Sequence, residues 1–391
     1  DIIATDPASG QLLWLWRAQE GERFDKAPRK GSGKGLAYWR EGGEERILTV
    51  TPGYYLVALN ARTGLPVEAF GAGGWVDLQE GLRLGPGRED LDIGLSFPPL
   101  VVEDVIIVGA SHALSTRPLA AENVKGDIRG FDARTGKLLW TFHTIPEKNE
   151  FGSETWLGDS ASYTGNAGVW APMAADPELD MVYLPVETPT GDYYGADRPG
   201  DNLFTASIVA IDAHTGEYRW HFQQVHHDIW DYDAPNPVML FDIDIDGVSR
   251  KALTQAGKTG WFYILDRITG APLLGIDEKP VPQEPRQATA ATQPFPRGDA
   301  FVPQSLRVPP AGVTLVNEGR IFTPYWTDAV AIAPGAGGGA NWPPSAHDPR
   351  TGYSYVCASD RPFLYAGIDI SDEPPKPGDR YTAGVFLGEA M

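Results

Sequence analysis

The sequence predicts an all-β fold and, within that class, a β-propeller of four-stranded antiparallel blades. Three observations support it: a turn signature that recurs along the chain, a second repeat that opens on tryptophan, and a composition of 45 Gly and 34 Pro in 391 residues. Such a composition suits short strands joined by tight turns. Few segments place apolar residues at a helical period, so we expect no long helices.

The turn signature has the form apolar-Asp-x-x-Thr-Gly-x-x-x-Trp. Its clear copies span 4–14, 130–140 and 210–220, and weaker copies span 58–64 and 264–270. The Asp and Thr side chains can cap a turn, and Gly supplies a positive φ angle. Each copy therefore predicts a hairpin whose second strand carries a tryptophan that can pack between adjacent sheets.

The second repeat places Trp, then Asp-Pro, then Tyr at equal spacings, after a glycine-rich approach. Its two copies run from Trp170 to Tyr183 and from Trp342 to Tyr355. Each copy is typical of a loop, a strand, a turn and a second strand. Repeated short antiparallel units favour a propeller. A stack of β-sandwiches is the alternative, although sandwiches do not usually repeat one hairpin signature.

The length exceeds the roughly 250–300 residues at which one core stops growing. The repeats favour modules in series, so we expect a single propeller domain over residues 1–391. The proline-rich stretches 279–310 and 373–377 are predicted to be connectors.

Charge and cysteine content exclude several function classes. Acidic residues outnumber basic ones by 52 to 32, for a net charge of −20, which argues against nucleic acid and anionic membranes as partners. No apolar run approaches the roughly 20 residues of a membrane span. Cys357 is the only cysteine, which rules out an intramolecular disulfide, a thiolate zinc cluster and a CxxCH haem attachment.

The turn signature resembles the tryptophan-docking motif of pyrroloquinoline quinone (PQQ) dehydrogenases. The longest match comprises residues 192–202, 220–231 and 257–267, and it is most similar to the glucose-dehydrogenase-like branch, which is related to methanol and ethanol dehydrogenases. The resemblance covers almost the whole chain and implies an eight-bladed propeller. Because only five signatures are visible, we expect terminal blades to be missing or some blades to lack the signature.

The resemblance implies a PQQ- and metal-dependent dehydrogenase that oxidises an alcohol, sugar or polyol by hydride transfer to the quinone. Asp231 matches the general base of that family and a ligand of its metal, which is Ca²⁺, Mg²⁺ or a lanthanide. A carboxylate must take the alcohol proton as hydride leaves carbon, and the cation polarises the quinone carbonyl. From the residues alone, Asp231 could equally cap a turn before Pro235.

Three further residues are candidate metal ligands. Asp233 would share a face with Asp231 in an extended segment, although it could also be a solvated loop residue. Thr188 stands where methanol-dehydrogenase-like members place an Asn, and the adjacent Glu187 could add charge. Glu122 falls within one residue of the family's metal-binding Glu; the alternative is an exposed loop residue.

Four residues are candidate PQQ contacts. Trp170 matches the floor under the planar quinone, and Lys258 matches the cation at the quinone oxygens. Otherwise Trp170 would pack a blade and Lys258 would be solvated. Asn341 and Trp342 open the second copy of the inner repeat and should point toward the pore. Lys34 stands where close relatives have Arg, and Lys cannot form a bidentate grip on a carboxylate.

The remaining expectations concern the electron acceptor, the cellular location and an alternative function. A single Cys excludes the vicinal disulfide of the methanol and ethanol branches, and without haem a separate acceptor, ubiquinone or cytochrome c, must take the electrons. His226 and His227 are adjacent and should face opposite ways, so we do not expect a metal pair. The resemblance implies a periplasmic location. The alternative function is a non-catalytic propeller scaffold for protein partners, which would need only the turns.

Overall fold

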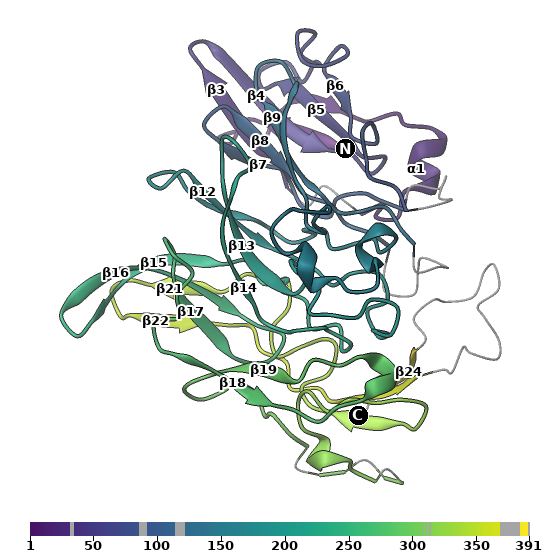
Figure 1. Cartoon of the computed structure of the whole chain (residues 1–391). Coiled ribbons are helices and arrows are strands. Elements are labelled where there is room, and N and C mark those ends of the chain that lie inside the picture. Colours follow the sequence, from purple (N-terminus) through teal and green to yellow (C-terminus); the bar gives the residue numbers. More distant parts are fainter. Residues whose placement is uncertain are drawn as a thin grey trace.

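The computed structural model describes residues 1–31, 35–85, 92–113, 122–306, 308–309, 311–312, 314–367 and 384–389. Strands dominate this part of the chain, where the α-helix is the short α1 (Glu22–Lys26) and no helix is long and apolar enough to cross a membrane. The sheets run from the purple N-terminal end through teal to green at the opposite end, and the yellow C-terminal strands lie beside the teal and green ones (Figure 1). The all-β prediction is confirmed.

Three sheets are complete four-stranded antiparallel units whose strands pair in chain order. The first holds β3 (Ala37–Glu41), β4 (Glu44–Val50), β5 (Tyr55–Asn60) and β6 (Trp75–Asp77); the second β7 (Leu100–Val102), β8 (Val105–Val108), β9 (Ile128–Asp132) and β10 (Leu138–Phe142); the third β11 (Ala174–Asp176), β12 (Met181–Pro185), β13 (Ser207–Asp212) and β14 (Tyr218–Gln223). These are the predicted blades.

The other sheets have two or three strands. The three-stranded sheets hold β15 (Met239–Ile245), β16 (Val248–Ala256) and β17 (Phe262–Asp266), and β20 (Val330–Ile332), β23 (Phe363–Gly367) and β24 (Gly384–Glu389); the pairs are β1 (Ile2–Thr5) with β2 (Leu12–Trp16), β18 (Ile276–Pro280) with β19 (Thr292–Pro296), and β21 (Ala346–Asp348) with β22 (Tyr353–Tyr355). Short 3₁₀ turns are η1 (Ser153–Thr155), η2 (Ser160–Ser162), η3 (Pro285–Gln287) and η4 (Asn317–Gly319). The hairpin β18–β19 corrects the prediction of a plain connector over 279–310. The number of blades stays a prediction.

The turn signature forms the capped hairpin that the sequence predicts. Asp132 Oδ1 accepts hydrogen bonds from the backbone N–H groups of Arg134 and Thr135, at 3.1 and 2.7 Å, and Gly136 has a φ of 73°. Asp6, Asn60, Asp212 and Asp266 repeat this pair of bonds. The side chain thus satisfies turn N–H groups that the ladder leaves free.

The tryptophan of one sheet packs against the signature glycine of the next. The pairs are Trp14 with Gly64, Trp140 with Gly216 and Trp220 with Gly270; a Cβ added at these glycines would lie 2.5, 2.6 and 2.5 Å from the indole. The indole N–H of Trp14 donates to Ala61 O at 3.0 Å, and that of Trp220 donates to Arg267 O at 3.2 Å. The predicted packing of tryptophan between sheets is confirmed.

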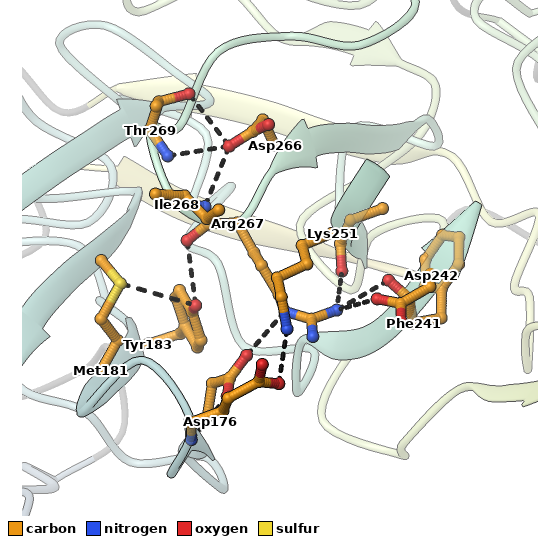
Figure 2. A network of polar contacts seen from close by, with 12 residues as sticks. Asp176, Met181, Tyr183, Phe241, Asp242, Lys251, Asp266, Arg267, Ile268 and Thr269 are labelled. Atoms are coloured by element: carbon orange, nitrogen blue, oxygen red, sulfur yellow. Dashed lines mark hydrogen bonds and ion pairs between the residues drawn. The ribbon is translucent and has the colours of Figure 1, made fainter. Parts of the chain in front are cut away.

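Arg267, which follows the Asp of its signature, ties two sheets together. Its Nε donates to Asp176 Oδ2 at 2.7 Å, and its Nη1 donates to Phe241 O at 2.8 Å and Asp242 Oδ1 at 2.9 Å. Figure 2 shows this guanidinium between the two carboxylates, with the Tyr183 hydroxyl on the Arg267 carbonyl. The ion pairs of Arg267 therefore hold the sheet β11–β14 against β15–β17, in addition to the packing of Trp220.

In the N-terminal half, the core consists of apolar layers between consecutive sheets. The neighbouring β8 residues Ile106 and Ile107 belong to different clusters: Ile106 packs with Leu48 of the preceding sheet, and Ile107 packs with Val182 of the following one. Side chains alternate across a strand, so the two faces of β8 are both covered. Each central sheet is held from both sides, as the blades of a propeller are.

Candidate active site

The glycine-rich approach before Trp170 lies close against neighbouring backbone. A Cβ at Gly168 would lie 2.5 Å from Ala110 O, and one at Gly165 would lie 2.4 Å from Asn123 C, so larger residues would push the loop away. The loop presents Trp170 half-buried, with its Nε1 donating to Asp233 Oδ2 at 2.8 Å. The predicted floor residue is thus fixed to a predicted metal ligand.

Asp231 lies in a turn between two buried aromatic residues. Its φ is 59°, in the left-handed region that is uncommon for residues other than glycine. Trp230 and Tyr232 on either side are 1% and 0% exposed, and Trp230 Nε1 donates to Thr323 O at 2.9 Å. The Tyr193 hydroxyl donates to Asp231 Oδ2 at 3.1 Å. The surroundings therefore hold a strained backbone and aim its carboxylate.

Lys258 lies between the two predicted carboxylates. Its Nζ is 3.0 Å from Asp231 Oδ1 and 2.5 Å from Asp233 Oδ1, and it donates to Asp231 O at 2.7 Å. A Cβ at Gly338 would lie 2.4 Å from Lys258 Cγ, so the second glycine-rich approach packs against the lysine stem. The Asp231 side chain is 21% exposed against 4% for Asp233, so Asp231 is the more accessible base.

The geometry corrects one detail of the sequence reasoning. We expected Asp231 and Asp233 to share a face of an extended segment, but Asp231 has a left-handed backbone and no strand covers residues 231–235. Their carboxylates still converge, because a turn brings both to the ammonium of Lys258.

Burial and mutual repulsion raise the pKa of two carboxyls at this site, those of Asp231 and Asp192. The pKa of Asp231 rises to about 8, chiefly through burial; the Lys258 charge opposes the rise, while Asp233 and Asp192 add to it. The pKa of Asp192 rises to about 7 through burial and through the charges of Glu187 and Asp233. Burial alone would lower the pKa of Lys258, but the charges of Asp231 and Asp233 outweigh it and raise that pKa.

Sequence reasoning did not single out Asp192 or His112. Asp192 accepts a hydrogen bond from Thr188 Oγ1 at 3.2 Å, which links the predicted ligand Thr188 to the acidic cluster. His112 Nδ1 lies 2.7 Å from Glu187 Oε1, and the same oxygen accepts from Gly168 N–H at 2.9 Å. Asp192 opens the longest match to the family, which is a signal that could have found it. Nothing in the local sequence points to His112.

The remaining predicted residues lie at other places. Glu122 pairs by backbone with Thr164, and its charge acts on Asp197 and Tyr163 rather than on the Asp231 cluster. Asn341 O accepts from Asn236 Nδ2 at 2.8 Å. The Trp342 ring, 43% exposed, lies 6.2 Å from that of Phe97. Lys34 lies outside the described residues.

The donor chemistry fits a planar acidic quinone with a hard cation. Trp170 offers a flat face, Lys258 a buried cation, and Asp231, Asp233, Asp192 and Thr188 offer the oxygen atoms that Ca²⁺ or a lanthanide takes. Within the described ranges, no three His, Cys, Asp or Glu side chains are already arranged to hold a metal ion. His226 and His227 have separate partners, Gln223 with Glu278 and Gly200 with Gln287.

Comparison with known proteins identifies relatives of this chain and its fold. The chain is 34% identical to the glycerol dehydrogenase large subunit of Gluconobacter oxydans, over 90% of this chain and 50% of that protein. It is 32% identical to the quinoprotein glucose dehydrogenase of Escherichia coli, over 75% of this chain and 37% of that protein. The chain therefore spans about half the length, or less, of these curated relatives.

Solved structures and a family model agree with these relatives. The quinohemoprotein alcohol dehydrogenase ADHIIG of Pseudomonas putida HK5 superimposes with a TM-score of 0.70 at 25% identity, covering 98% of this chain and 52% of that one. A europium-containing methanol dehydrogenase shares the fold, with a TM-score of 0.66 at 22% identity over 96% of this chain and 60% of that one. The PQQ model, described as glucose/ethanol/alcohol dehydrogenase, β-propeller domain, matches residues 1–383. The chain thus belongs to the PQQ family of glucose, ethanol and alcohol dehydrogenase β-propellers.

Proposed function

We propose that this chain forms the catalytic propeller of a PQQ-dependent dehydrogenase that oxidises an alcohol, sugar or polyol by hydride transfer to the quinone. One observation carries the proposal: the Lys258 ammonium holds both Asp231 and Asp233, and Asp233 in turn holds the Trp170 indole. A scaffold protein has no need of a buried lysine between carboxylates or of a left-handed Asp231. Relatives named glycerol and glucose dehydrogenases support the same function.

Asp231 takes the proton of the substrate hydroxyl. Its Oδ2 is bound by the Tyr193 hydroxyl and its Oδ1 by Lys258, so the carboxylate is held in one orientation. Burial raises the pKa of Asp231 to about 8 although the Lys258 charge opposes the rise, so the ionised form that a general base requires prevails above that pH. The proton moves from the substrate oxygen to Asp231 as the hydride leaves carbon.

PQQ supplies the two-electron acceptor when it is bound. Trp170 would stack on its ring, and Lys258 would present a positive charge to its oxygens, as would suit an acceptor that gains negative charge. Asn341 and Trp342 remain proposed contacts at the pore. These residues would orient the quinone, and Asp231 would hold the proton.

For the metal we propose a hard cation, Ca²⁺ or alternatively Mg²⁺ or a lanthanide, held by oxygens of Asp231, Asp233 and Thr188. Asp192 joins this set because its carboxyl accepts a hydrogen bond from Thr188 and its charge helps to raise the pKa of Asp231. Glu122 stays a prediction from the sequence. The single domain over 1–391, the periplasmic location and a separate acceptor, ubiquinone or cytochrome c, are proposals from the family resemblance.

The test is reconstitution of purified protein with PQQ and Ca²⁺, then with PQQ and La³⁺, followed by dye reduction with a panel of alcohols, sugars and polyols. Asp231→Asn should lower kcat about 10²–10⁴-fold, the usual contribution of a general base. The matched control is Asp246→Asn, because Asp246 also has a positive φ but lies exposed in the β15–β16 turn.

PQQ binding is measured separately, by quenching of tryptophan fluorescence. Binding should persist in Asp231→Asn and weaken in Trp170→Leu. Absence of PQQ binding under every metal condition would overturn the proposed function, and full turnover by Asp231→Asn would overturn its role as base.

A further inference from the structure

Lys258 and Tyr193 each hold one oxygen of the Asp231 carboxylate. The Lys258 ammonium donates to Oδ1 at 3.0 Å, and the Tyr193 hydroxyl donates to Oδ2 at 3.1 Å. The Asp231 side chain is 21% exposed, so these contacts do not seal the carboxylate off. The two oxygens of the proposed base therefore differ in the chemistry of the group that holds each of them.

This difference decides which oxygen can take a proton. An ammonium has three N–H donors and no acceptor, whereas a phenol hydroxyl can both donate and accept. The Lys258 ammonium also donates to Asp231 O at 2.7 Å and lies 2.5 Å from Asp233 Oδ1, so it would lose these contacts by turning away from Oδ1. A proton on Oδ1 would face an N–H group, but a proton on Oδ2 can be donated to the Tyr193 oxygen.

Accepting that proton requires the Tyr193 hydroxyl to turn. Within the described part of the chain, Asp231 Oδ2 is the one hydrogen-bond partner of this hydroxyl, so no other donor engages the lone pairs of its oxygen. Rotation about the C–O bond moves the hydrogen away from Oδ2 and brings a lone pair toward it. The change needs no movement of the ring.

The position of the Tyr193 ring does not depend on this hydrogen bond. The Tyr325 hydroxyl lies 2.9 Å from Tyr193 O and 2.6 Å from Ile229 O and can donate to either. The Tyr365 ring lies 6.1 Å from that of Tyr193, and its hydroxyl donates to Trp230 O at 3.1 Å. The same two tyrosines thus hold Tyr193 and the segment that carries the base, so loss of the Tyr193 hydroxyl alone should leave both in place.

We propose that Tyr193 is a second catalytic residue and that Oδ2 of Asp231 is the oxygen that takes the substrate proton. The inference rests on the proposed function, whose proton transfer it resolves to one atom. The substrate O–H bond breaks and an Oδ2–H bond forms, while the hydride leaves carbon with its electron pair for the quinone and the C–O bond becomes C=O. The Tyr193 hydroxyl donates to Oδ2 before this step, accepts from Oδ2 after it, and keeps its own proton throughout.

The test compares Tyr193→Phe with wild type, both reconstituted with PQQ and Ca²⁺ and assayed with the best substrate of the panel. The kcat should fall about 10–100-fold, the usual contribution of one hydrogen bond to a charged group, while KM and PQQ binding stay within twofold. Tyr183→Phe is the control, because it removes a buried hydroxyl that donates to Arg267 O at 2.9 Å, and it should change none of these values.

The direction of the change in kcat separates this role from a simpler one. A hydroxyl that only stabilised the ionised carboxylate would make Asp231 a weaker base, so its loss would leave kcat unchanged or raise it. Either result would overturn the proposal. With substrate deuterated at the reacting carbon, the isotope effect on kcat should be larger in Tyr193→Phe than in wild type, because the transfer step becomes slower relative to product release. A lower kcat with a smaller isotope effect would also overturn it.

Infrared difference spectra of the protein without PQQ give a readout without turnover. At alkaline pH, where Asp231 is ionised, the carboxylate band that Asp231→Asn removes should shift in Tyr193→Phe and stay in place in Tyr183→Phe. An unshifted band in Tyr193→Phe would overturn the hydrogen bond and with it the proposal. A shifted band in a protein that never binds PQQ or reduces dye would instead overturn the proposed function alone.

Discussion

At the scale of single residues, the main feature of the site is that two carboxylates share one buried ammonium. Lys258 is 5% exposed and contacts both Asp231 and Asp233, so its charge offsets part of the cost of burying them. Removing one charge of a buried ion pair leaves the other charge buried without a partner. The resulting loss of stability is larger than the net stabilisation that the intact pair provides.

Lys258→Met should therefore lower the free energy of unfolding by about 3–5 kcal/mol. The measurement is urea denaturation at neutral pH. Lys137→Met, in the exposed turn before β10, is the control and should stay within about 0.5 kcal/mol of wild type. A Lys258→Met variant as stable as wild type would show that the ammonium does not compensate these carboxyls.

His221 makes stability depend on mildly acidic pH. Burial, with the nearby His226, lowers the pKa of His221 to about 4, against about 6.5 in an unfolded chain. Between these two pH values the unfolded state binds more protons than the folded state. The contribution of His221 to the free energy of unfolding is therefore fully present above pH 6.5 and falls by up to about 3 kcal/mol as the pH drops toward 4. His221→Phe keeps a ring beside Phe204 and removes this part of the dependence.

Urea denaturation of both proteins from pH 7 to pH 4 checks this. The wild type should lose stability relative to His221→Phe as pH falls, although both retain the similar contribution of His227, whose pKa is also about 4. Parallel curves for the two proteins would contradict the assignment.

Sequence reasoning reached, within one motif block, the residues to which we assign the proposed chemistry. Asp231, Lys258 and Trp170 could be found because their spacing matches the family, and the structure brings them together. Asp192 and His112 could not be chosen, because their roles depend on loops from different sheets meeting at Thr188 and Glu187.

At the scale of elements, the signature glycine has two reasons to be glycine. The sequence explains the first, a positive φ in the turn. The structure adds the second, because the indole of the preceding sheet occupies the space of a side chain at Gly64, Gly216 and Gly270. The sequence could not show this, because the two groups are far apart along the chain.

Gly270→Ala and Gly10→Ala separate these two reasons. Their φ angles are 75° and 71°, but a Cβ at Gly270 would lie 2.5 Å from Trp220, whereas Gly10 has open space around it. Gly10→Ala should cost about 1 kcal/mol from φ alone, and Gly270→Ala should cost about 1–3 kcal/mol more from the clash. Equal losses of stability in urea would show that the Trp220 contact adds nothing.

The hairpin β18–β19 shows where element prediction failed. Prolines in 279–310 suggested a connector, but Pro280, Pro294 and Pro296 all lie in strands of this pair. A two-stranded sheet has only edges, so a proline there need not remove a ladder hydrogen bond. Proline density therefore marks an edge here rather than the absence of strands.

At the scale of the whole molecule, the sheets of the N-terminal half are stabilised by their neighbours in sequence, whereas β21–β22 packs against β15, with the rings of His347 and Phe241 4.6 Å apart. Ile106 and Ile107 of β8 pack on opposite sides, against different sheets. In contrast, the terminal hairpin β1–β2 exposes Ile3 and Leu13 by 57% and 60%. Stability should therefore be uneven along the chain.

Hydrogen exchange followed by mass spectrometry should show this gradient. Amides of β1–β2 should exchange at least about 100-fold faster than those of β12 and β13, whose apolar side chains are buried between sheets. Uniform exchange over these strands would contradict the view that sheets are stabilised serially and would indicate one cooperative unit.

The contact between indole and glycine also makes the packing of the blades independent of the loops between them. Gly64 follows Trp14 by 50 residues and Gly216 follows Trp140 by 76 residues, yet a Cβ at either glycine would meet the indole at nearly the same distance. The joint between blades is therefore insensitive to the length of the loops that it spans. Evolution and protein engineering alike can lengthen, shorten or exchange those loops, and so change the surface that they present, without rebuilding the scaffold.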